Sequence, residues 1–329
     1  MRNMAQPVVM SHTLVTSDGV PIDAVHLPGE SDLAIVLAHG FTFSWQRHSV
    51  WRIANRFNRV AGVISFDFRG HGRSGGLSTL GDREIKDLDV AVAYARQLGY
   101  KRIGLVGFSM GASIVVRYAG LIGGVDAAAS ISGPGRWYYR GTERMRRVHF
   151  AAEHRVGRLA TRMLTRTRIS PDRWNPTPVP PYEAAAQISP IPLLVVHGDK
   201  DLYFPVEHAR QLYDAARDPK ELWLIPGFAH AESGCGNGLA DRIANWVVTA
   251  ARTGTAQGEA GAPRDVDEPG PPAGEAAPDA AEQAAEAAGA AAVADMSPAD
   301  AIGAEALEAE ESGTISAGMP SEGGPSARP

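Results

Sequence analysis

The chain has 329 residues and a mass of 34.9 kDa, enough for one large α/β domain or two small ones, so a mini-protein is excluded. Its net charge of −5 is distributed unevenly along the sequence. Residues 253–329 contain 15 acidic and two basic residues, whereas residues 1–252 carry a net charge of +8.

The C-terminal part, residues 253–329, is rich in Ala, Gly, Pro and Glu and has no aromatic residue, Lys or Cys. Such a segment buries too little apolar surface to offset an ordering entropy of about 1–2 kcal/mol per residue. We therefore predict a folded domain over residues 1–252 and a disordered acidic tail over residues 253–329.

The cysteine content and the lengths of the apolar stretches indicate the cellular compartment in which the protein is expected. The single cysteine, Cys235, cannot form an internal disulfide, which removes the main reason to expect an oxidising compartment. The N-terminal residues have no continuous apolar segment, and no stretch approaches the about 18 apolar residues of a membrane-spanning helix. We expect a cytoplasmic protein without a transmembrane segment.

Apolar periodicity outlines the domain. Residues 12–27 alternate apolar and polar side chains around Ser17-Asp18-Gly19, as two antiparallel strands joined by a tight turn do. Short apolar runs typical of strands buried on both faces follow at residues 33–38, 62–66, 103–106, 127–131 and 193–196. Helical patterns are found at residues 49–57, 82–98, 112–119, 206–216 and 239–249. This alternation predicts an α/β fold with a mostly parallel, doubly wound sheet and a working site at the carboxyl ends of its strands.

Residues 134–187 interrupt the alternation, as an insertion over the active edge of the sheet would. Between positions 136 and 173 the insertion contains 11 Arg and three acidic residues. We interpret it as a small helical lid whose basic residues form a solvated face, steer anionic substrates, or make peripheral contact with anionic lipid headgroups beside the aromatic residues Trp137, Tyr138 and Tyr139. A further alternative is that the acidic tail shields this basic insertion.

A GxSxG motif, residues 107–111, joins the apolar run at 103–106 to the helical pattern that follows. A strand-to-helix turn this tight needs Gly at its flanks, and it lifts the hydroxyl of Ser109 above the sheet edge. A serine becomes an effective nucleophile only when a base removes its proton and an acid orients that base. The candidates follow in the order expected for such a sheet: Asp199 and Asp201 after the run at 193–196, then His230 before the last helical pattern.

Further motifs follow other predicted strands, namely His39-Gly40-Phe41, DFRGHGRS at residues 67–74 and HGDKDLYFP at 197–205, and GFAH at 227–230 lies in the loop after the apolar residues 222–225. With GFSMG at 107–111, they make the chain resemble the α/β-hydrolase superfamily over residues 12–250, specifically its lysophospholipase-like and serine-aminopeptidase-like bacterial esterases. The resemblance implies Ser109 as nucleophile, His230 as general base and Asp201 as its orienting acid.

The reaction also needs two backbone N–H groups that stabilise the developing oxyanion. We expect these donors at Met110, directly after the nucleophile, and at Phe41, after His39-Gly40. The alternatives are Asp199 as the acid, and His197, His39 or His71 as the base, although the resemblance makes these three histidines structural. Cys235 lies five positions after His230 and is expected to be incidental.

The predicted function is hydrolysis of small-molecule carboxylic esters through an acyl-enzyme. Amide, peptide, thioester and lysophospholipid cleavage remain alternatives on the same triad, as does a catalytically silent scaffold whose acidic tail recruits partners. No cofactor or metal is expected, because phosphate-binding Gly motifs and metal-ligand spacings are missing. Nucleic-acid binding is not expected either, because the acidic tail would compete with phosphate for the basic insertion. The sequence leaves the oligomeric state open.

Overall fold

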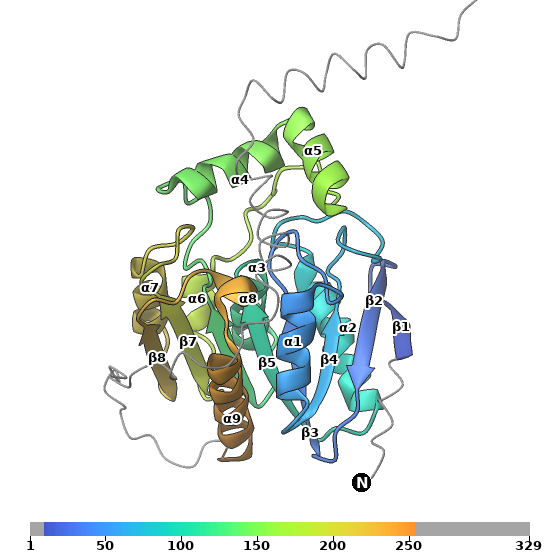
Figure 1. The fold of residues 1–329 in the computed structure, drawn as a ribbon, viewed down its shortest axis with the longest axis vertical. Helices are drawn as coiled ribbons and strands as arrows, with labels where there is room; N and C mark the ends of the chain where they lie inside the picture. The colour runs from blue at the N-terminus through green and yellow to red at the C-terminus, as the bar shows by residue number, and fades with distance from the viewer. Residues whose placement is uncertain (1–9, 254–329) are drawn as a thin grey trace, which may run out of the picture.

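A computed structural model describes residues 10–253, which form an eight-stranded sheet in the order β1-β2-β4-β3-β5-β6-β7-β8 (Figure 1). The strands are β1 (Met10–Val15), β2 (Pro21–Leu27), β3 (Leu33–Ala38), β4 (Gly62–Phe66), β5 (Arg102–Phe108), β6 (Ala127–Ile131), β7 (Leu193–Gly198) and β8 (Lys220–Ile225). Strand β2 pairs antiparallel with β1 and β4, and all the pairs from β4 to β8 are parallel. The predicted mostly parallel α/β sheet is therefore confirmed.

The sheet is buried on both faces because helices cover each of them. One face packs against α1 (His48–Phe57), α8 (Ala231–Gly234) and α9 (Asn237–Thr253). The other packs against α2 (Glu84–Gln97), α3 (Met110–Leu121), α6 (Pro181–Ala185) and α7 (Glu207–Ala215). Strand β3 illustrates the two-sided burial: Ile35 and Leu37 belong to the first core, and Val36 belongs to the second.

The order of the strands determines where a site can form. From β3 the chain passes through α1 to β4 on one side, and from β4 through α2 to β5 on the other side of β3. The carboxyl ends of β3 and β5 are therefore neighbours at the point where the strand order reverses, which is where such sheets bind ligands. The segments that leave these two ends contain His39-Gly40-Phe41 and Ser109.

Between β6 and β7 the chain leaves the sheet and forms α4 (Glu143–Glu153) and α5 (Arg155–Thr165), here called the lid hairpin. In Figure 1 these helices stand beyond the carboxyl end of the sheet, whereas α6 lies beside the sheet. Helix α6 packs against α3 so closely that a Cβ on Gly120 would come within 2.1 Å of the Ala184 carbonyl oxygen. The part of the insertion that rises above the sheet is thus the lid hairpin.

Within residues 10–253 no helix combines the length and the apolar character that crossing a bilayer requires. The predicted acidic tail lies outside the described residues, apart from Thr253, which ends α9.

Candidate active site

Ser109 stands at a strained turn between β5 and α3. Its φ of 49° and ψ of −114° are unusual for a residue with a side chain, and such strain concentrates at functional sites. The flanking glycines are required sterically: a Cβ on Gly107 would come within 2.4 Å of the Gly111 carbonyl oxygen, and one on Gly111 within 2.3 Å of the Ala38 carbonyl oxygen. The GxSxG sequence therefore allows β3, β5 and α3 to converge around Ser109.

Ser109, His230 and Asp201 come together although they are far apart in the sequence. The Oγ atom of Ser109 lies 2.9 Å from Nε2 of His230, and Nδ1 of His230 lies 2.7 Å from Oδ2 of Asp201. The ring of Tyr203 packs beside the His230 imidazole at a centroid distance of 4.3 Å. This chain of contacts has the geometry needed to take a proton from the serine hydroxyl.

Asp201 is built to remain ionised inside the protein. Its second carboxylate oxygen accepts hydrogen bonds from the N–H groups of Tyr203 and Phe204 at 2.8 and 3.0 Å. Burial opposes ionisation, but the interactions with His230 and the Phe204 N–H outweigh it, and the pKa of Asp201 lies below its usual value. A fixed carboxylate holds the imidazole in one tautomer and one orientation.

The alternative acid and one alternative base occupy other positions. Asp199 is exposed and accepts a hydrogen bond from the Gly227 N–H at 2.7 Å, so it organises the turn after β8. His197 is buried behind Asp201 and donates from Nε2 to the Phe204 carbonyl oxygen at 2.8 Å. Burial lowers the pKa of His197.

His39 helps to orient the peptide that contains the expected oxyanion donor at Phe41. Its Nε2 accepts a hydrogen bond from the Phe68 N–H at 3.1 Å, so its proton is on Nδ1, which donates to the Gly40 carbonyl oxygen at 2.7 Å. That oxygen and the Phe41 N–H belong to one planar peptide group, so fixing the oxygen also fixes the direction of the N–H. Burial lowers the pKa of His39 to about 3, which keeps the ring neutral.

His71, the other alternative base, lies beside His39, with ring centroids 5.2 Å apart. Its Nδ1 lies 3.0 Å from the Arg69 carbonyl oxygen, and burial lowers its pKa to about 4. Both rings are buried within the loops after β3 and β4.

Glu232 is a residue of the site that the sequence analysis missed. It follows His230 by two positions in α8, is 1% exposed, and its Oε1 accepts a hydrogen bond from the Gly40 N–H at 2.5 Å. A Cβ on Gly40 would lie 3.2 Å from Oε2 of Glu232 and 3.3 Å from the Cβ of Ser109, so the carboxylate and Ser109 both pack closely on Gly40. The sequence signal, a single acid after the histidine, is too common to be recognised.

Cys235 is fully buried, and its Sγ lies 3.9 Å from the Gly236 carbonyl oxygen. Burial raises the pKa of its thiol to about 12. The thiol therefore stays protonated and unreactive, in agreement with its expected incidental role.

A cavity of about 750 Å³ opens over Ser109 and His230 and is also lined by Phe41 and Met110. The lid hairpin and its flanking segments supply much of the remaining wall, including aromatic and aliphatic side chains at Trp137, Tyr138, Tyr139, Met145, Val148 and Trp174. Trp137 and Tyr138 pack on Trp174 with ring centroids 5.2 and 5.3 Å apart. The three sequential aromatic residues thus form part of the cavity wall.

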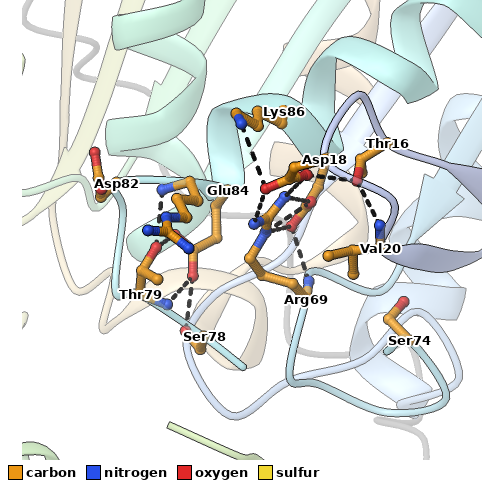
Figure 2. Close-up of polar contacts among 12 residues, drawn as sticks. Thr16, Asp18, Val20, Arg69, Ser74, Ser78, Thr79, Asp82, Glu84 and Lys86 are labelled. Atoms are coloured by element: carbon orange, nitrogen blue, oxygen red, sulfur yellow. Dashed lines mark hydrogen bonds and ion pairs between the residues drawn. The ribbon is translucent and has the colours of Figure 1, made fainter. Parts of the chain in front are cut away.

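A buried carboxylate holds another part of this wall, the loop of residues 78–81. Figure 2 shows the side chain of Glu84, at the start of α2, directed toward Ser78 and Thr79. Its carboxylate accepts from the hydroxyl of Ser78 at 2.8 Å, the hydroxyl of Thr79 at 2.7 Å, and the N–H groups of Thr79, Leu80 and Gly81 at 2.7 to 3.1 Å. Trp174 then donates from Nε1 to the Thr79 carbonyl oxygen at 2.6 Å. The chain that returns from the lid hairpin is thereby attached to a rigid loop.

Arg69, next to this loop, ties three elements together (Figure 2). Its guanidinium donates to Asp87 of α2 at 2.8 to 3.2 Å and to Asp18, in the turn between β1 and β2, at 2.9 and 3.0 Å. Arg69 and Asp87 are almost completely buried, with side chains 3% and 0% exposed. Arg69 therefore fixes the loop after β4 against α2 through Asp87 and against the N-terminal hairpin through Asp18.

Within residues 10–253 no group of three or more His, Cys, Asp or Glu side chains is arranged to hold a metal ion.

Comparison with known proteins places the chain in a family. The pattern of the alpha/beta hydrolase family matches residues 35–241. The uncharacterized protein YfhR of Escherichia coli O157:H7 is 37% identical over 68 residues, which are 20% of this chain and 24% of that relative, so the match spans about a quarter of its length. A monoacylglycerol lipase of Mycolicibacterium smegmatis is 31% identical over 237 residues, which cover 60% of this chain and 80% of the lipase.

Among solved structures, the Pyrococcus furiosus esterase Pf2001 superimposes with a TM-score of 0.60 and 22% identity. The superposition covers 74% of this chain and 91% of the esterase, and at this identity it supports the fold alone. The family match, the identity with the lipase and the shared fold agree with one another. The chain belongs to the alpha/beta hydrolase family.

Proposed function

We propose that this protein is a serine hydrolase that cleaves carboxylic esters through an acyl-enzyme on Ser109. The observation that carries the proposal is the hydrogen-bonded chain of Ser109, His230 and Asp201, with distances of 2.9 and 2.7 Å, at an aromatic-lined cavity. Membership of the alpha/beta hydrolase family supports a hydrolase of this kind.

In the first half of the reaction, Nε2 of His230 takes the proton of the Ser109 hydroxyl while Oγ attacks the ester carbonyl carbon. The tetrahedral intermediate collapses, the bond to the alcohol oxygen breaks, and His230 returns the proton to the leaving alcohol. Asp201 stabilises the imidazolium that exists between these two transfers.

In the second half, a water molecule replaces the alcohol. His230 takes a proton from it, the hydroxide oxygen attacks the acyl carbon, and the bond to Ser109 Oγ breaks as the proton returns to that oxygen. The products are a carboxylic acid and the regenerated serine.

The oxyanion of each tetrahedral intermediate is assigned to the N–H groups of Phe41 and Met110. Met110 begins α3, and the first N–H groups of a helix have no partner within the helix. Phe41 follows Gly40, whose carbonyl oxygen and N–H are held by His39 and Glu232. Donors fixed before the reaction need no reorganisation when the negative charge develops.

The cavity favours an ester with an extended apolar acyl group. Its volume of about 750 Å³ and its aromatic wall suit an amphiphilic molecule, and the related Mycolicibacterium protein is a monoacylglycerol lipase. Amide, thioester and lysophospholipid hydrolysis remain alternatives on the same triad.

The experiment that tests the proposal is labelling of the full chain with a fluorophosphonate probe, followed by mass-spectrometric mapping of the adduct. An adduct on Ser109 that is absent in Ser109→Ala, together with hydrolysis of 4-nitrophenyl esters, is the expected result. A folded wild-type protein that neither reacts with the probe nor hydrolyses any ester in an acyl-length series would favour a catalytically silent scaffold instead.

A further inference from the structure

Helix α5 of the lid hairpin buries its small and polar side chains. Gly157, Thr161 and Thr165, at intervals of four residues, are buried. The two threonine hydroxyls are satisfied within the helix, because Thr161 donates to the Gly157 carbonyl oxygen at 2.8 Å and Thr165 to that of Thr161 at 2.7 Å. A Cβ on Gly157 would come within 2.6 Å of the Cα of Ala151, so α5 packs closely on α4 without large apolar side chains.

The large apolar side chains of the last turn of α5 point to solvent instead. Met163 is 72% exposed and Leu164 is 50% exposed. A helix that covers a protein core turns such residues inward. The outer surface of this turn therefore has apolar groups available for a contact outside the domain.

Basic side chains accompany these apolar groups. Residues 154–171 contain five arginines and no acidic residue. Arg155, Arg162 and Arg166, at the start, the last turn and the end of α5, are all exposed. The surface is thus both cationic and apolar, which is the combination that amphipathic helices use to bind anionic lipid surfaces.

The position of α5 agrees with such a role. Figure 1 places it at the far end of the molecule, beyond the carboxyl ends of the strands. The cavity at that end exposes two further apolar side chains of its lining, Tyr138 at 57% and Leu202 at 63%. A surface that received α5 would therefore lie at the same end of the molecule as these exposed side chains of the cavity.

We propose that the outer face of α5 is a docking surface for an anionic phospholipid bilayer, with Met163 and Leu164 inserted among the headgroups and the arginines bound to lipid phosphates. A protein can bind an anionic bilayer without a surface of complementary shape, provided that it presents cationic charge and accessible apolar groups. Both are present on this helix. The inference concerns binding, so it stands apart from the proposed ester hydrolysis.

The test is co-sedimentation of the full chain with vesicles, using Ser109→Ala to avoid lipid turnover. One set of vesicles is pure phosphatidylcholine and the other contains phosphatidylglycerol. We expect binding to the anionic vesicles that weakens at high salt, and little binding to the neutral ones.

Two lid variants and two matched controls locate the surface. Arg155→Gln with Arg162→Gln should weaken binding about thirtyfold, and Met163→Ser with Leu164→Ser about tenfold or more. The controls remove the same groups elsewhere: Arg59→Gln with Arg210→Gln, and Leu121→Ser with Ile122→Ser at the end of α3, where the apolar side chains are 38% and 53% exposed. Thermal unfolding checks that all four variants fold.

Equal vesicle binding by the lid and control variants would overturn the proposal. Equal binding to vesicles with and without phosphatidylglycerol would also overturn it. Self-association that is lost in the Met163/Leu164 variant, without vesicle binding by the wild type, would also overturn it and assign the surface to a second copy of the chain. In proteins that keep the native Ser109, the lid substitutions should leave the hydrolysis of a short, water-soluble ester unchanged. Failure of docking is therefore distinguishable from failure of the proposed function.

Discussion

Glu232 accepts a hydrogen bond from the backbone N–H of Gly40 at 2.5 Å and so joins two loops of the site that are 192 residues apart. One loop contains His230, the proposed base, and the other contains Phe41, the proposed oxyanion donor. The Gly40 N–H precedes the peptide group whose N–H belongs to Phe41. We interpret Glu232 as a positioning residue that holds the oxyanion loop at a fixed distance from the base.

Replacing this acid should therefore affect turnover more than substrate binding. Glu232→Ala removes the acceptor of the Gly40 N–H, and we expect kcat to fall about ten- to a hundredfold, somewhat less than when an oxyanion donor is deleted. KM should change little, because the oxyanion forms only in the transition state. Steady-state kinetics with a 4-nitrophenyl ester provides the measurement.

Glu232→Gln is the matched control, because its side-chain oxygen can still accept from Gly40. Recovery of most of the lost kcat in this variant would assign the effect to the hydrogen bond. If the Gln variant were as slow as the Ala variant, the negative charge rather than the position of the loop would be responsible. Unchanged kcat in Glu232→Ala would remove the positioning role.

Asp201 and Asp199 provide a second test, because they lie two residues apart with different partners. Asp201→Asn should lower kcat by as much as about 10⁴-fold, the loss known for the equivalent change in another serine enzyme, because an amide no longer holds His230 in the productive tautomer. Asp199→Asn should keep a kcat close to the wild-type value, since Asp199 is exposed and accepts from the Gly227 N–H, whereas Nδ1 of His230 is held by Asp201. A reversed order of the two variants would move the acid to Asp199.

The apolar strands were predictable because burial on both faces leaves a continuous apolar run. Strands β3, β4 and β6 begin and end at the predicted residues, and the strands at 102–108 and 193–198 extend the predicted runs. The predicted helices are all present, but most of their ends differ, by up to four residues, because apolar periodicity fades where a helix leaves the core. The two lid helices had no predicted bounds, since α5 packs through Gly and Thr rather than through large apolar residues.

Only some residues of the candidate site could be predicted from the sequence. Ser109, His230 and Asp201 were recognisable because each follows a strand within a motif. The two acids that position the loops, Glu232 and Glu84, could not be recognised in this way, because their partners come near them only when the chain folds. Glu232 accepts a hydrogen bond from Gly40 after β3, and Glu84 accepts hydrogen bonds from the N–H groups of a turn.

The Arg69–Asp87 pair should contribute to stability far more than an exposed pair does. Arg69→Met leaves the fully buried carboxylate of Asp87 without its main counter-charge, and we expect the free energy of unfolding to fall by about 3–5 kcal/mol. The control is Arg102→Met, which removes a pair with Asp32 whose side chains are 38% and 42% exposed, and should cost at most about 1 kcal/mol. Urea unfolding measures both, and similar losses would contradict this ranking.

Buried histidines should make stability depend on pH, and His208 of α7, which packs on Phe204, allows this to be tested without replacing a residue of the proposed triad. His208 is 2% exposed, its Nδ1 accepts a hydrogen bond from the Gly135 N–H at 3.0 Å, and burial lowers its pKa from 6.5 to about 4. Between pH 6.5 and pH 4 the unfolded chain therefore binds a proton at this residue that the folded chain does not bind. The corresponding stability is complete above pH 6.5 and is lost as the pH falls toward 4.

In His208→Asn the amide oxygen can still accept from Gly135, but the side chain does not titrate. Below pH 6, the unfolding free energy of the wild type should therefore fall relative to that of the variant by about 1.4 kcal/mol per pH unit, while the effects of titrating groups that do not interact with His208 cancel. Urea unfolding at pH 7 and pH 5 gives this difference. A difference that stays constant between the two pH values would mean that the folded protein accommodates a protonated His208, and the hydrogen bond from Gly135 would then have to break without cost.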